Sequence, residues 1–102
     1  MTKAVLIGTE RVDLKEIDLD IEPEKNQIMQ IFGSQATFIG QWPDIDVVIL
    51  KSVNDDDDIN KNVLPYPFTD TIVRGPILLV RMDENSEPRD FTLKEYKLFR
   101  CR

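Results

Sequence analysis

The chain has 102 residues, of which 41% are hydrophobic and 31% are charged, a composition typical of an ordered globular protein. We expect one domain over residues 1–102, because folding at this size buries roughly 65% of the surface that the unfolded chain exposes. The formal net charge is −6 and histidine is absent. Nucleic-acid-binding proteins usually gather basic residues on one face, so direct binding of DNA or RNA is not expected.

The cysteine content and the short apolar runs indicate a cytoplasmic protein. Cys101 is the single cysteine and cannot form an internal disulfide, and the N-terminus lacks the long apolar stretch that marks a signal peptide. The longest apolar runs, at residues 47–50 and 77–80, are far shorter than the roughly 20 residues of a membrane-spanning helix. We therefore expect a protein that is neither secreted nor bound to a membrane.

Residues 4–21 predict a β-hairpin. A short apolar strand at residues 4–7 is followed by a turn expected around residues 8–11. The next apolar residues alternate with polar ones, but positions 12 and 14 are out of phase with positions 17, 19 and 21. A β-bulge near Lys15 and Glu16 would bring both sets to the same core, because a bulge places two residues opposite one.

Residues 23–32 predict the main helix. Pro23 suits a first helical position, and Ile28, Ile31 and Phe32 recur at the spacing of one helical face. Gly33 follows as the glycine that commonly ends a helix. The apolar face of this helix is expected to pack on the core.

A strand predicted at residues 36–39 leads to Trp42, the only tryptophan. Because Trp42 precedes a proline, its backbone should be extended, and its ring is expected to cap one edge of the core. An exposed ring would instead make Trp42 a candidate anchor for a binding partner.

Two wholly apolar runs predict the middle of the sheet. Residues 47–50 read Val-Val-Ile-Leu, which favours an interior strand covered on both faces, and residues 77–80 are its expected neighbour. Pro76 has no amide hydrogen to donate to a strand ladder. Gly75 and Pro76 should therefore mark the start of the second strand, or a break after an extended piece at residues 71–73.

The four aspartates at residues 55–58 are the one segment that suggests a metal site. A calcium loop starting at Asp56 would need glycine at its sixth position and a carboxylate at its twelfth, where the chain has Lys61 and Pro67. Adjacent like charges repel each other and favour a solvated loop. We expect such a loop, with weak adventitious binding of a divalent cation as the alternative.

Residues 93–100 predict a short C-terminal helix. Thr92 and Glu95 have the spacing of a capping box, in which each side chain bonds the backbone amide of the other residue. Phe91 is expected to be a hydrophobic staple ahead of this helix or a strand residue. The helical side chains expected to pack on the sheet are Leu93, Tyr96 and either Leu98 or Phe99.

Together these elements predict an α+β fold with a single mixed or mainly antiparallel sheet of about five strands. One main helix, roughly at residues 23–32, and the short C-terminal helix, roughly at residues 93–100, complete the prediction.

Few residues of this chain suit catalysis. Histidine, the commonest general base near neutral pH, is absent, and Cys101 near the end of the chain is a poor candidate nucleophile. No phosphate-binding glycine loop or nucleophile motif occurs, and nothing selects a catalytic pair from the 19 acidic residues. We therefore expect a protein that is not an enzyme, with no cofactor, no catalytic residue and no metal-binding residue.

Residues 60–74 are the candidate surface for a protein partner. Tyr66, Phe68 and Arg74 lie among prolines here, and aromatic and arginine side chains dominate interface energetics. With Trp42 they form the predicted partner-binding set. The alternative is that Tyr66 and Phe68 cover the core beneath a long connection.

Several short motifs follow one another in a recognisable order. They are Val5-Leu6-Ile7, a helix that ends at Gly33, Val47-Val48-Ile49, Asn62 with Leu64-Pro65, Gly75-Pro76 with the apolar run at 77–80, and Thr92-Leu93. This order resembles short uncharacterised proteins of phages, mobile elements and large algal viruses that are grouped as a domain of unknown function. The resemblance implies a viral or mobile-element accessory protein, and it assigns no activity.

We expect a small acidic module that binds a host or viral protein without catalysis. One alternative is an acidic DNA mimic that inhibits a nucleic-acid-binding protein of the host. Another is a minor structural component of the virion. A homo-oligomer formed through an uncovered edge strand, particularly at residues 71–73, is also open.

Overall fold

The computed structural model describes residues 2–20, 23–54 and 58–101, and these residues form an α+β fold, as predicted. In chain order the elements are β1 (Thr2–Ile7), β2 (Leu14–Leu19), the 3₁₀ helix η1 (Pro23–Lys25), α1 (Gln27–Phe32), β3 (Ala36–Trp42), the 3₁₀ helix η2 (Pro43–Ile45), β4 (Val47–Ser52), β5 (Ile77–Met82), β6 (Pro88–Arg89) and α2 (Leu93–Arg100).

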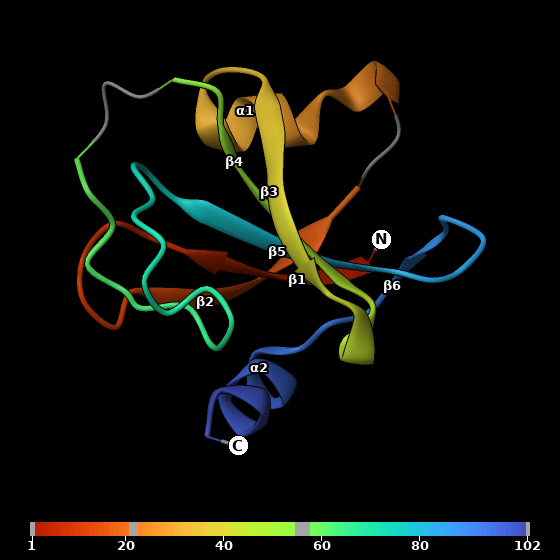
Figure 1. Cartoon of the computed structure of the whole chain (residues 1–102). Coiled ribbons are helices and arrows are strands. Elements are labelled where there is room, and N and C mark those ends of the chain that lie inside the picture. The colour runs from red at the N-terminus through yellow and green to blue at the C-terminus, as the bar shows by residue number, and fades with distance from the viewer. Residues whose placement is uncertain (1, 21–22, 55–57, 102) are drawn as a thin grey trace.

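The strands form one antiparallel sheet with β5 at its centre. The order is β2-β1-β5-β4-β3, and the short β6 pairs with the end of β5 (Figure 1). In the pairing of β4 with β5, Val48 lies opposite Val80 and Ile49 opposite Leu79. The prediction that the two apolar runs are neighbours in the middle of the sheet is confirmed.

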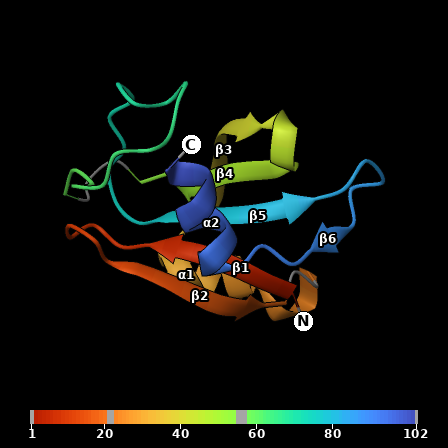
Figure 2. The same cartoon turned by 90° about the horizontal axis from the view of Figure 1, so that it is seen from below.

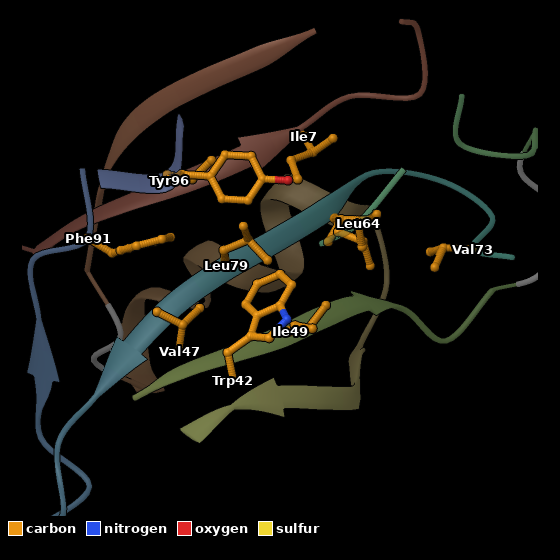
Figure 3. Close-up of a cluster of buried hydrophobic side chains, with 11 residues drawn as sticks. Ile7, Trp42, Val47, Ile49, Leu64, Val73, Leu79, Phe91 and Tyr96 are labelled. Atoms are coloured by element: carbon orange, nitrogen blue, oxygen red, sulfur yellow. The ribbon is translucent and has the colours of Figure 1, made fainter. Parts of the chain in front are cut away.

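The two helices lie on opposite faces of this sheet (Figures 1 and 2). On the α2 face, the β4 side chains Val47 and Ile49 are completely buried (Figure 3). On the α1 face, Val48 and Leu50 are only half-buried, because α1 has six residues and covers a limited part of the sheet. The prediction that this strand is covered on both faces therefore holds fully for one face only.

The N-terminal hairpin forms without the predicted bulge. Its register runs unbroken from Thr2 opposite Leu19 to Ile7 opposite Leu14, so the prediction of a bulge near residues 15–16 is wrong. Leu14 packs with the core on the α2 face, whereas Ile17 packs with the core on the α1 face. The described residues Leu14, Ile17 and Leu19 thus serve two cores, and no extra residue is needed. The register shift of the sheet lies instead in β3, between residues 38 and 40.

The predicted main helix is divided in two. Asn26 has a φ of 49°, a left-handed conformation that asparagine tolerates better than most residues, and it separates η1 from α1. The side chain of Gln27 ties α1 to the preceding strand, since it accepts from the amide of Asp20 at 2.6 Å and donates to the carbonyl of Asp18 at 3.0 Å. Gly33 has a φ of 69° and ends α1, as predicted.

Residues 58–75 form a long connection with no strand at 71–73. A single bridge joins Ile59 to Arg74 in the part of this segment that the structure describes, and residues 71–73 form no strand. Of the two predicted alternatives, Gly75 and Pro76 therefore mark the start of β5. Two asparagines tie the connection to the hairpin. Asn60 donates to the carbonyl of Ile7 in β1 at 3.5 Å and to that of Gly75 at 2.9 Å. Asn62 donates to the carbonyls of Gly8 at 2.9 Å and Glu10 at 2.7 Å.

Three of the four aspartates of the acidic run, residues 55–57, lie outside the described residues. The fourth, Asp58, is exposed, and its carbonyl accepts from the amide of Gly75 at 2.8 Å.

The C-terminal helix has the predicted boundaries and the predicted cap. The Thr92 hydroxyl accepts from the amide of Glu95 at 3.1 Å, and the Glu95 carboxylate accepts from the amide of Thr92 at 3.3 Å. Phe91 and Tyr96 form an edge-to-face pair with ring centroids 6.2 Å apart, so Phe91 is the hydrophobic staple. Phe99 packs on the core, whereas Leu98 is 65% exposed, which settles the predicted choice between them.

Candidate functional site

A groove of about 680 Å³ lies between the connection at residues 63–69, the start of η2 and the C-terminal turn of α2. Figure 2 shows the end of α2 beside this connection. The groove is lined by apolar and aromatic side chains with one acid and one base at its rim. The lining residues are Trp42, Pro43, Asp44, Val63, Leu64, Pro65, Tyr66, Pro67, Thr69, Phe99 and Arg100.

Trp42 forms the inner wall of the groove and belongs to the core. Its side chain is 3% exposed and lies among the buried core side chains (Figure 3). Its ring contacts Phe68 and Phe99 edge to face, at centroid distances of 5.8 and 5.2 Å. The indole N–H donates to the carbonyl of Tyr66 at 3.1 Å. Trp42 therefore caps the core, as expected, and the condition that would make it an exposed anchor is not met.

The structure separates Tyr66 from Phe68. Phe68 is half-buried and packs against the core, which agrees with the interpretation of this side chain as a cover. Tyr66 is 82% exposed and lines the groove. The two residues therefore have different roles, because a side chain so exposed contributes little to covering the core.

The fourth predicted residue, Arg74, lies apart from the groove lining. It is exposed and forms the bridge with Ile59 that holds residues 58–75 together. The structure thus brings Trp42 and Tyr66 to one groove, with Phe68 directly behind Trp42, and it does not bring Arg74 to them.

Sequence reasoning missed the contribution of α2 to this groove. Phe99 and Arg100 line it, and the guanidinium carbon of Arg100 lies 5.9 Å from the ring centroid of Tyr96. Burial raises the pKa of Tyr96 to about 12, although the charge of Arg100 acts in the opposite direction. The ring that faces Arg100 is therefore a neutral phenol near pH 7.

A second cluster fixes α2 against the sheet behind the groove. Arg81 forms an ion pair with Glu95 at 2.8 Å and lies over the Phe91 ring, 5.1 Å from its centroid. Burial pushes the pKa of Glu95 upward, but hydrogen bonds from Arg81 and Thr92 outweigh it and hold this pKa below its usual value. Glu95 thus stays ionised at neutral pH and anchors the helix.

Other classes of site find little support in the part of the chain that the structure describes. Within residues 2–20, 23–54 and 58–101, no group of three or more histidine, cysteine or acidic side chains could hold a metal ion. No helix among these residues is long and apolar enough to span a membrane. The groove offers an apolar surface with one acid, Asp44, and one base, Arg100, at its rim.

The comparison with known families agrees with the expected grouping of this chain as a domain of unknown function. A family of unknown function, DUF5880, matches residues 5–99. The chain belongs to the DUF5880 family. The matched residues run from β1 to the last turn of α2, so this DUF5880 chain carries the groove lining within the family's span, except for Arg100. No curated protein and no solved structure matches it.

The position of Phe68 behind the groove can be tested at Gly40, in the neighbouring strand β3. A Cβ atom added at Gly40 would lie 2.4 Å from Cζ of Phe68, so Gly40→Ala is expected to lower the free energy of unfolding by about 1–3 kcal/mol. Removal of the ring should relieve the clash. The double variant Gly40→Ala/Phe68→Ala should therefore be more stable than the sum of the single effects implies.

Urea unfolding of the wild type, both single variants and the double variant measures this coupling. Simple additivity would contradict the placement of the Phe68 ring on Gly40. Gly33→Ala cannot serve as a control for Gly40→Ala. Gly33 has a positive φ, so alanine there would strain the backbone, although nothing lies within 4 Å of an added Cβ atom.

Proposed function

We propose that this DUF5880 protein is a non-catalytic module that binds an extended peptide segment of another protein in the groove between residues 63–69 and α2. The observation that carries the proposal is the 82% exposure of Tyr66 at the rim of an aromatic-lined groove. Exposed tyrosine is among the residue types that most often dominate binding energy, because it contributes a large area at a small entropic cost.

The arrangement of the groove supports a peptide as the occupant. Trp42 and Phe99 provide a rigid apolar wall that is already packed in the free protein, so little ordering is needed on binding. Pro65 and Pro67 hold Tyr66 on a backbone of limited freedom. Grooves of this kind, lined by aromatic side chains, are a recurring means of binding extended peptides.

We further propose a biological setting that rests on the resemblance of the motifs. The protein would be an accessory protein of a virus or mobile element, active in the cytoplasm of the host cell, with a host or viral protein as its partner. The net charge of −6 supports a protein partner over direct binding to nucleic acid.

The proposal can be tested with a displayed library of random peptides selected on the intact protein. A selected peptide should bind the wild type, and Tyr66→Ala should weaken it by roughly 30-fold, equivalent to about 2 kcal/mol. Ile72→Ala is the matched control, because Ile72 is 76% exposed and does not line the groove. Fluorescence anisotropy with the labelled peptide gives both affinities.

Circular dichroism should show that both variants keep the melting temperature of the wild type. Failure to select any peptide, or equal effects of Tyr66→Ala and Ile72→Ala on every selected peptide, would overturn the assignment of this groove.

A further inference from the structure

We propose that the peptide bound in this groove is acidic, with a carboxylate side chain on the guanidinium of Arg100 and a neighbouring apolar side chain between Tyr66 and Phe99. This inference rests on the proposed function and adds the chemical class of the partner.

Exposed basic side chains are concentrated on α2. The chain as a whole carries a net charge of −6, yet Lys94, Lys97 and Arg100 are exposed on this helix. Its one acid, Glu95, is occupied by Arg81 at 2.8 Å and by the helix cap. The outward side of α2 is therefore a basic surface on an acidic protein, and such a surface attracts a segment of opposite charge.

Arg100 itself occupies a position from which it can contact a bound ligand. It lines the groove, and its guanidinium lies over the face of the Tyr96 ring, at 5.9 Å from the centroid. Stacking of this kind limits the positions that the side chain adopts before a ligand arrives. Among the described residues, Arg100 forms no ion pair, so its planar set of N–H donors is open to a carboxylate.

The basic surface of α2 continues beyond the groove. Lys97 lies one helical turn before Arg100 and borders a shallow apolar hollow that Leu93 and Leu98 also line. Neither the Lys94 nor the Lys97 ammonium group has an ion pair or hydrogen bond within residues 2–20, 23–54 and 58–101. A second acidic residue of the same peptide, some positions away from the one that binds Arg100, would lie close enough to Lys97 to form an ion pair.

Attraction to the helix dipole explains why cations occur in the last turn of α2, but it does not explain the adjoining groove. A phosphate backbone would also attract Arg100, yet a nucleic acid would leave the apolar wall of Trp42 and Phe99 in contact with a charged chain and would face the net charge of −6. A peptide with acidic residues beside an apolar one would match both Arg100 and the apolar wall of the groove.

The experiment extends the peptide selection described above. Selected peptides should be enriched in aspartate and glutamate beside an aromatic or aliphatic residue. Arg100→Glu should weaken the best peptide by roughly tenfold or more, and Lys97→Glu by a smaller factor, because the charge-assisted hydrogen bond is lost and repulsion replaces it. Lys15→Glu, at an exposed site on β2, makes the same change in net charge and should have little effect. Binding to the wild type should weaken as NaCl is raised.

Outcomes of this experiment separate the two proposals. The selected peptides could lack acidic enrichment, bind the Tyr66→Ala variant more weakly than the wild type, and bind the Arg100→Glu variant as tightly as the wild type. That result would overturn the proposal of an acidic peptide, but the assignment of the groove as a peptide-binding site would stand. Equal weakening by Arg100→Glu and Lys15→Glu would also overturn it, since net charge alone would then account for the effect. The circular dichroism spectrum of Arg100→Glu should match that of the wild type, which shows that the variant is folded. Arg100→Gln removes the charge without adding a negative one, so its affinity for the peptide should lie between those of the wild type and Arg100→Glu.

Discussion

Replacement of Phe91 by alanine should lower the free energy of unfolding by about 3–5 kcal/mol, the range expected for removal of a large aromatic side chain from a core. Phe91 is completely buried, and its ring contacts Tyr96 of α2 and Arg81 of β5. Its ring is the staple partner of Tyr96, and the guanidinium of Arg81 lies over it at 5.1 Å. Chemical denaturation monitored by circular dichroism measures the loss.

Leu98→Ala is the matched control for this variant. Leu98 lies on the same helix that Phe91 helps to hold, but it is 65% exposed, and its truncation should cost less than about 0.5 kcal/mol. A loss for Phe91→Ala as small as that for Leu98→Ala would contradict the packing of α2 on the sheet. Because α2 forms one wall of the groove, Phe91→Ala should also weaken peptide binding without removing any lining residue.

Asn60→Leu should cost about 2–4 kcal/mol, although leucine has a similar size and is more hydrophobic, because buried polar groups left without a partner cost about 1–3 kcal/mol each. The Asn60 side chain is buried and joins three parts of the chain. It donates to the carbonyls of Gly75 and Ile7, at 2.9 and 3.5 Å, and accepts from the amide of Asn62 at 2.9 Å. Thermal and urea denaturation report the change.

Asn85→Leu makes the same chemical change in an exposed turn between β5 and β6, where a negligible effect is expected. A loss for Asn60→Leu no larger than for Asn85→Leu would show that the hydrogen bonds of Asn60 do not hold residues 58–75 to the hairpin. Amide hydrogen exchange should show the consequence locally, with faster exchange at Asn62 and Val12, whose amides depend on this cluster.

Much of the architecture could be predicted because periodicity and local chemistry determine it. The apolar runs of β4 and β5 predicted their pairing, and the Thr92–Glu95 spacing predicted the start of α2. The bulge prediction failed because it assumed that all apolar residues of the hairpin face one core. Val12 also has a φ of 62°, which is rare for a β-branched residue, so its apolar character gave a misleading strand signal.

The groove was harder to predict because it is made by elements that only the tertiary fold brings together. Tyr66 and Phe68 are two positions apart and chemically similar, yet one is exposed and the other packs against Trp42. Arg100 follows the general preference for cations at helix C-termini, so nothing in its sequence context pointed to a groove. The exposure of Tyr66 and the burial of Phe68 depend on the positions of the start of η2 and the end of α2 in the folded protein. The local sequence around the two aromatic residues does not encode these positions.

The strand order also determines when the molecule can acquire its shape during biosynthesis. β1 pairs with β5, and the backbone of Lys3 exchanges hydrogen bonds with Asp90 and Phe91. The nascent hairpin leaves the ribosome with one long side of β1 unpaired, because its partner strand β5 is translated only after residues 8–76. Productive folding therefore waits until β5 has been translated, and in that interval a chaperone that shields apolar strands has its opportunity to act.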